Sequence, residues 1–121
     1  MLMLCASVAH ATQEIVCKAA DNAAWISFLV GGTPGLNPLA LSMGAGGKIW
    51  STAKENGGTL VQVSQSFSSS EDMKIDVSND SEDAIARLRL SQAHEDGQEP
   101  ITAGTLHIVG VGAWPVTCEE G

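Results

Sequence analysis

Cations are scarce in this sequence. Six Lys and Arg stand against fourteen Asp and Glu, and the formal net charge is −8. Affinity for nucleic acid comes mostly from basic side chains that displace counterions, so this charge balance argues against a nucleic-acid partner. Anionic membrane surfaces are repelled for the same reason. The charge permits a basic protein or a metal ion as a partner.

Aromatic residues are also few: tyrosine is absent and phenylalanine occurs twice. Charged residues make up 17% of the chain and apolar residues 44%, which predicts a packed domain rather than disorder. The 121 residues fit one domain, and thirteen glycines favour short strands and turns over long helices. The aromatic part of the core must come from Trp25, Trp50, Trp114 and either Phe28 or Phe67.

The first eleven residues, MLMLCASVAHA, contain no Lys, Arg, Asp or Glu. An apolar run followed by Ala9-His10-Ala11 has the small-x-small pattern that signal peptidase recognises. This predicts a signal peptide over residues 1–11, a mature domain over 12–121, and a periplasmic or secreted protein. No cation precedes the run, so we expect the signal peptide to begin upstream of Met1. The alternative is that residues 2–8 form a first strand.

We expect no membrane insertion, because no other segment approaches the ~20 apolar residues of a membrane span.

Cleavage before Thr12 would remove Cys5 and leave two cysteines, one near each end of the mature chain. An isolated pair in an oxidising compartment indicates a disulfide, so we predict a bond between Cys17 and Cys118. A metal or redox site is the alternative. It is disfavoured because the two cysteines lie far apart, form no CxxC motif and have no neighbouring histidine.

Several segments alternate apolar and polar residues with period two, which predicts strands with one face on a core. Four such faces are made by Met73, Ile75 and Val77, by Ala86, Leu88 and Leu90, by Val61, Val63, Gln65 and Phe67, and by Leu106 and Ile108. The segment 24–30 is apolar apart from Ser27, as expected of a strand covered on both faces. Segments 14–18, 48–52 and 114–118 bring the total to about eight strands.

Turn-forming sequences separate these strands at residues 31–35, 44–47, 56–58 and 78–81. Their Asn-Gly and Gly-Gly pairs supply the positive φ angles of tight hairpins. Short strands joined in this way predict an all-β antiparallel meander. Such a meander must close as a small barrel or a sandwich to protect its edges.

The sequence indicates no enzyme and no cofactor. The loop at residues 44–48 lacks the spacing and the following Ser or Thr of a phosphate-binding loop. The mature chain offers only His94, in a polar loop, and His107, on a strand, as histidine bases. The acidic run Asp80-Ser81-Glu82-Asp83 could supply calcium ligands, but it lacks the spacing of a calcium loop, and a solvated turn is favoured.

The arrangement of export signal, early cysteine, β meander and late cysteine resembles that of small periplasmic lysozyme inhibitors. The stretch 42–50, SMGAGGKIW, is similar to the Ser-Gly loop and following Trp strand of that family. The resemblance implies inhibition of a basic enzyme such as lysozyme. The family's loop usually carries a Tyr after its Ser-Gly element, whereas this chain contains no Tyr. The resemblance is therefore one of architecture, and no family residue role is transferred.

These observations predict an exported, non-catalytic binding module that binds another protein or an envelope component. The acidic charge suits a basic protein partner, and inhibition of a basic enzyme such as lysozyme is the sharpest form of this prediction. The alternative is a carrier that holds a small apolar ligand inside a barrel. For the binding module, we predict that glycine-rich loops and an acidic turn form one contact face, because recognition usually lies on loops. Trp50 has a simpler alternative role as a buried core residue. The predicted contact residues are Ser42, Gly46, Lys48, Trp50, Asp80, Glu82 and Asp83.

Overall fold

The computed structural model describes residues 13–31, 38–54 and 57–120, and the predicted signal peptide lies outside these ranges. Ten strands and a short 3-10 helix, η1 (Ala20–Asn22), make up this part of the chain. None of its helices is long and apolar enough to cross a membrane. The strands are β1 (Gln13–Lys18), β2 (Ala24–Val30), β3 (Pro38–Ala45), β4 (Lys48–Ser51), β5 (Thr59–Leu60), β6 (Gln62–Ser68), β7 (Asp72–Ser78), β8 (Ala84–Ala93), β9 (Ile101–Ile108) and β10 (Gly112–Glu120).

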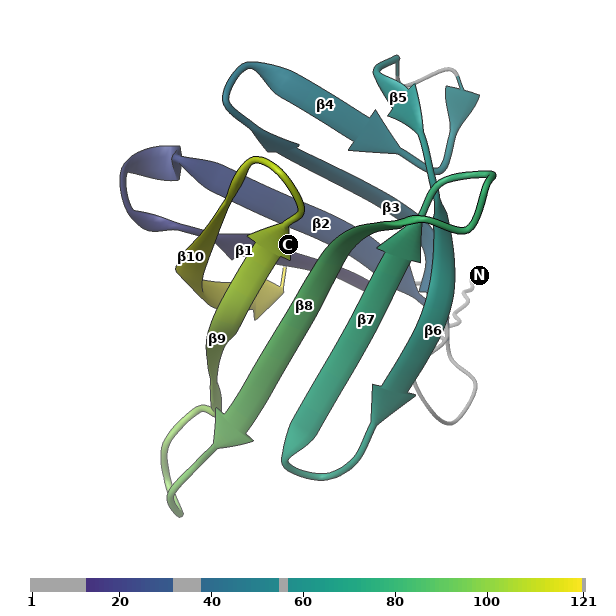
Figure 1. The fold of residues 1–121 in the computed structure, drawn as a ribbon. Helices are drawn as coiled ribbons and strands as arrows, with labels where there is room; N and C mark the ends of the chain where they lie inside the picture. Colours follow the sequence, from purple (N-terminus) through teal and green to yellow (C-terminus); the bar gives the residue numbers. More distant parts are fainter. Residues whose placement is uncertain (1–12, 32–37, 55–56, 121) are drawn as a thin grey trace, which may run out of the picture.

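The strands form one sheet that curls into a nearly closed barrel (Figure 1). Their order is β5-β4-β3-β2-β1-β10-β9-β8-β7-β6, and every neighbouring pair is antiparallel except β4 and β5. The two outermost strands, β5 and β6, are joined through Val61, whose N–H donates to the Ser51 carbonyl at 2.9 Å. The chain itself therefore crosses the seam, which confirms the predicted all-β meander in its barrel form.

The predicted disulfide is present between Cys17 and Cys118. The two cysteines face each other directly in the pairing of β1 with β10. The bond thus joins the first and last strands of the sheet, as expected from the two isolated cysteines.

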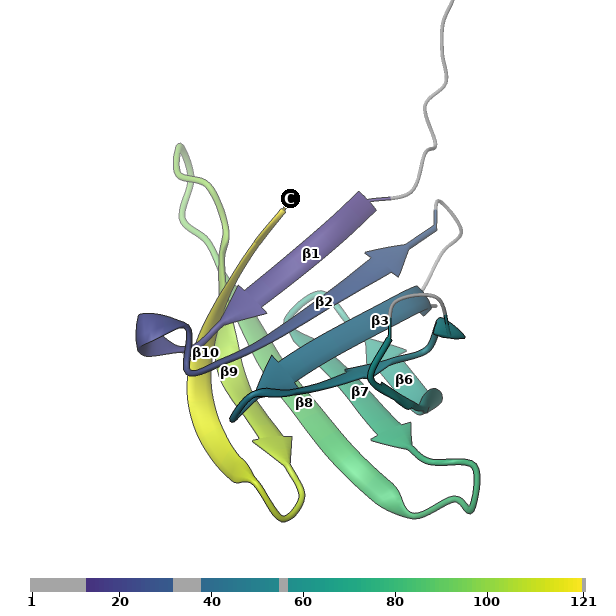
Figure 2. The ribbon, with the colours of Figure 1, turned by 90° about the horizontal axis from the view of Figure 1, so that it is seen from above.

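The strand connections define two ends of the barrel. The β8–β9 end holds the β6–β7 and β8–β9 connections, the start of β1 and the end of β10 (Figure 2). The opposite β7–β8 end holds the β3–β4, β7–β8 and β9–β10 connections. Loops that are distant in the sequence therefore meet at the same end.

Alternate side chains on the strands point inward and pack as one buried cluster. The predicted inward faces of β7, β8 and β9 are confirmed, since Ile75, Leu88 and Leu106 are almost inaccessible to solvent. Strand β2 differs in part from the expectation. Ile26 and Phe28 on its inner face are buried, whereas the outer residues, including Trp25, are only half-buried. The barrel wall therefore covers this strand fully on one face.

The predicted inward face of β6 is wrong beyond Val63. The pairing of β6 with β7 shifts register between Val63 and Gln65, which leaves Ser64 as an extra residue. A bulge of this kind reverses which side chains face the core. Phe67 consequently points outward with 53% of its surface exposed, and Phe28 is the phenylalanine in the core.

Two of the ten observed strands were not predicted: β3 and the two-residue β5. Strand β3 contains Pro38 and Gly44, residues that usually indicate turns. Pro38 is tolerated because it is the first residue of the strand. Gly44 is required because a Cβ there would lie 2.5 Å from the indole nitrogen of Trp25 on the neighbouring strand β2.

Candidate functional site

The predicted contact residues on β3, β4 and their hairpin differ in accessibility. Gly46 and Lys48 are exposed, and Gly46 has the positive φ of 59° that the turn requires. Ser42 is half-buried, with its hydroxyl 3.4 Å from that of Ser51. Trp50 is 8% exposed and belongs to the core cluster. Its indole is thus placed to support the hairpin from inside rather than to contact a partner.

The predicted acidic contacts lie in the turn between β7 and β8. The side-chain oxygen of Asn79 accepts hydrogen bonds from the backbone N–H groups of Ser81 and Asp83, both at 2.9 Å. Asp80, Glu82 and Asp83 are all exposed around it. This turn and the β3–β4 hairpin lie at the same end of the barrel, but across the seam β5 and β6 lie between β4 and β7. The structure therefore places the predicted residues at one end without merging them into one patch.

Sequence reasoning missed Trp25 as a surface feature of this end. Its indole lies against Gly44 on the outside of the sheet, next to Ile49, which is 46% exposed. Trp25, Ile49, Lys48 and the hairpin glycines line a hollow of about 260 Å³. The glycine inside β3 was the available signal, because a strand glycine often marks a close approach by another group.

A larger hollow, of about 610 Å³, opens at the β8–β9 end. Its apolar lining comes from Ile15, Met73 and Pro100 together with Cys118 of the disulfide. Ile15, Met73 and Cys118 pack against the core cluster beneath. The remaining lining residues are polar or acidic: Gln92, Thr102, Glu99, Glu119 and Glu120. The hollow therefore has an apolar floor and carboxylates along its rim.

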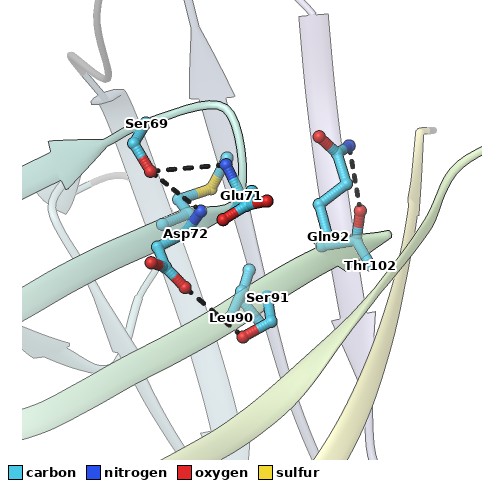
Figure 3. Close-up of a pocket in the computed structure, with 8 residues that line it drawn as sticks. Ser69, Glu71, Asp72, Leu90, Ser91, Gln92 and Thr102 are labelled. Atoms are coloured by element: carbon cyan, nitrogen blue, oxygen red, sulfur yellow. Dashed lines mark hydrogen bonds between the residues drawn. The ribbon is translucent and has the colours of Figure 1, made fainter. Parts of the chain in front are cut away.

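A smaller hollow of about 30 Å³ adjoins it and shares Met73, Gln92 and Thr102 with it (Figure 3). The Ser69 hydroxyl accepts hydrogen bonds from the backbone N–H groups of Glu71, at 3.3 Å, and Asp72, at 3.1 Å. The Gln92 amide donates to the Thr102 hydroxyl at 3.3 Å. The first two bonds order the β6–β7 turn, and the third joins the facing ends of β8 and β9. The backbone N–H of Gln92 donates to the Glu71 carbonyl at 2.8 Å and links the turn to β8.

Eight of the fourteen acidic residues of the chain lie at this end, and all eight are exposed. In the part of this end that the structure describes, the loops and strand termini contain no Lys or Arg. We call these residues the acidic end: Glu14, Glu71, Asp72, Glu95, Asp96, Glu99, Glu119 and Glu120. Sequence reasoning singled out acids at the opposite end because Asp80, Glu82 and Asp83 are contiguous. The acidic end instead gathers residues from the start of β1, the end of β10, and the β6–β7 and β8–β9 connections.

The described residues contain no group of three His, Cys, Asp or Glu side chains that converges as a metal site. His94 is exposed in the β8–β9 loop, and His107 is exposed on the outer face of β9. Comparison of the chain with protein-family models, curated proteins and solved structures finds no match.

Proposed function

We propose that this chain is a non-catalytic binding module that holds a basic protein against its acidic end. One observation carries the proposal: eight exposed carboxylates, with no described Lys or Arg among them, lie at the end that holds a hollow of about 610 Å³. Three of them, Glu99, Glu119 and Glu120, line this hollow beside its apolar floor. Long basic side chains have an apolar stem and a charged tip. A Lys or Arg of the partner would place its stem on Met73 and Pro100 and its charge beside Glu99 or Glu119.

The contribution of such a surface to the free energy of binding follows from the size of each interaction. An exposed ion pair contributes about 0.2–1 kcal/mol, so no single carboxylate accounts for tight binding. The acidic end offers eight carboxylates in one place, and their summed field accelerates the encounter with a basic surface. Burial of the partner's side-chain stems in the hollow adds the apolar contribution that exposed ion pairs lack.

The scaffold keeps the cost of binding low. Glu119 and Glu120 follow Cys118 directly and pair in the sheet with Val16 and Ile15 of β1. The disulfide and this pairing fix the backbone of both residues before a partner arrives. A surface that is ordered in advance loses less conformational entropy on association.

Inhibition of a basic secreted enzyme such as lysozyme is the sharpest form of the proposal. It follows from the architectural resemblance, from the net charge of −8 and from a disulfide, which is typical of exported proteins. In this form the protein acts in the periplasm or outside the cell.

The test is a titration of a c-type lysozyme at low and high ionic strength, measured by calorimetry. We expect binding at low salt and at least a tenfold loss in the variant Glu99→Gln/Glu119→Gln/Glu120→Gln. The matched control is Asp80→Asn/Glu82→Gln/Asp83→Asn, which removes three charges at the opposite end and should weaken binding less than threefold.

Equal loss of affinity in both variants would show that net charge alone matters. A larger loss in the control would place the site on the loops predicted from sequence. Absence of binding at low salt would remove the lysozyme form.

A small-ligand carrier remains the second candidate, and the same hollow favours it. The inward side chains of the described strands form one packed cluster, so the hollow at the β8–β9 end is where an apolar ligand would sit. Native mass spectrometry of the purified protein tests this candidate. A bound mass that disappears in the variant Met73→Lys would support the carrier, whereas a ligand-free protein would count against it.

A further inference from the structure

Cationic side chains gather on the outer face of β7, β8 and β9, on the wall of the barrel rather than at either end. Lys74, Arg87 and Arg89 are three of the six Lys and Arg in the whole chain. The sheet register aligns them with β9 in two neighbouring rows. One row is Lys74, Arg89 and Thr105, and the other is Asp76, Arg87 and His107.

This alignment places hydrogen-bond donors opposite donors. Lys74 lies directly across from Arg89, which puts two like charges side by side. Arg87 lies between Asp76 on β7 and His107 on β9. Like charges in such positions destabilise a sheet, whereas opposite charges would stabilise it. The chain has fourteen acidic residues, yet only Asp76 occupies these two rows. Sheet stability therefore does not explain the pairing of Lys74 with Arg89.

The single acid of the two rows is already engaged. The Arg89 guanidinium lies 2.8 Å from Asp76 Oδ1, an ionic contact without the alignment of a hydrogen bond, and it also donates to the Leu88 carbonyl at 2.9 Å. The Lys74 ammonium lies 5.8 Å from the centre of the Phe67 ring. Arg87, Thr105 and His107 are exposed, and their side chains have no hydrogen-bond or ion-pair partner among the residues that the structure describes.

We infer that Arg87, Thr105 and His107 form a binding site for a single oxyanion group, either a phosphate or a carboxylate of a small ligand. Facing side chains on neighbouring strands are about 5 Å apart at Cβ, and diagonal ones about 7–8 Å. Three donors at this spacing can each reach a different oxygen of one group, and a guanidinium can bind two oxygens at once. A small ligand is favoured over a long polyanion, because a polyanion would extend over the rest of a molecule whose charge is −8.

The test is a titration of isotope-labelled protein at constant low ionic strength, followed by backbone and imidazole NMR shifts. Inorganic phosphate is the probe in one arm, citrate in the second, and sodium chloride in the control. We expect saturable shifts at Arg87, Thr105 and His107 in at least one oxyanion arm. The arm with the lower dissociation constant identifies the oxyanion as phosphate or carboxylate.

Arg87→Gln should weaken oxyanion binding at least fivefold, because it removes the only unengaged guanidinium of the site. Lys48→Gln removes one cation from the β3–β4 hairpin and should leave the titration unchanged. Chloride shifts of equal size at the same residues would overturn the proposal, as they would indicate general screening. An unchanged dissociation constant in Arg87→Gln would overturn it as well. Both variants alter exposed side chains, and an unperturbed spectrum elsewhere confirms that each is folded.

Discussion

Phe28 and Phe67 have the same side chain but opposite positions in the barrel. Phe28 is 1% exposed and Phe67 is 53% exposed. Phe28→Ala should lower the free energy of unfolding by about 3–5 kcal/mol, because it leaves a cavity in the core. Phe67→Ala should lower it by less than about 1 kcal/mol, since it loses mainly the contact with the Lys74 ammonium. Urea denaturation monitored by circular dichroism measures both values. Similar losses in the two variants would contradict the register shift in β6.

At the scale of elements, the most consequential contact is between β1 and β10, the first and last strands. Their disulfide joins residues separated by 101 positions. Closing a loop of this length stabilises a fold by about 4–5 kcal/mol in the chain-entropy model. Cys17→Ala/Cys118→Ala should lower the free energy of unfolding by up to that amount, as measured by urea denaturation. The wild-type protein should lose a similar amount under reducing conditions, and the double variant should not respond to reductant. Intact mass of the folded protein showing two free thiols would refute the pairing.

For the molecule as a whole, charge is distributed unevenly. Acids concentrate at the β8–β9 end, and half of the Lys and Arg residues lie on the wall formed by β7 and β8. If the acidic end attracts a basic partner, the association rate should depend strongly on salt, because screening shortens the reach of the field from ~30 Å at 0.01 M to ~10 Å at 0.1 M.

Stopped-flow mixing with a c-type lysozyme measures this salt dependence. We expect the association rate constant to fall at least tenfold between about 0.01 and 0.3 M salt. Glu99→Gln/Glu119→Gln/Glu120→Gln should flatten the dependence more than Asp80→Asn/Glu82→Gln/Asp83→Asn, although both variants have the same net charge. Equal slopes would mean that the field of the whole molecule, rather than the acidic end, steers the encounter.

The sequence by itself determined the features that are local or compositional. Alternation in Met73, Ile75 and Val77 predicted their inward face, because successive side chains of a strand point to opposite sides. Two isolated cysteines predicted the disulfide, and a count of acids and bases yields the net charge of −8. Each of these inferences needs only neighbouring residues or a count.

Tertiary structure decided which residues meet and which faces are exposed. The bulge at Ser64 turns Phe67 outward, and Gly44, expected in a turn, lies in β3 with Trp25 packed against it. The acidic end joins Glu14 to Glu119, residues that approach each other only when β1 pairs with β10. The rows on the barrel wall depend on the register of three strands. Pairing register is a relation between distant segments, so no pattern within a single segment contains it.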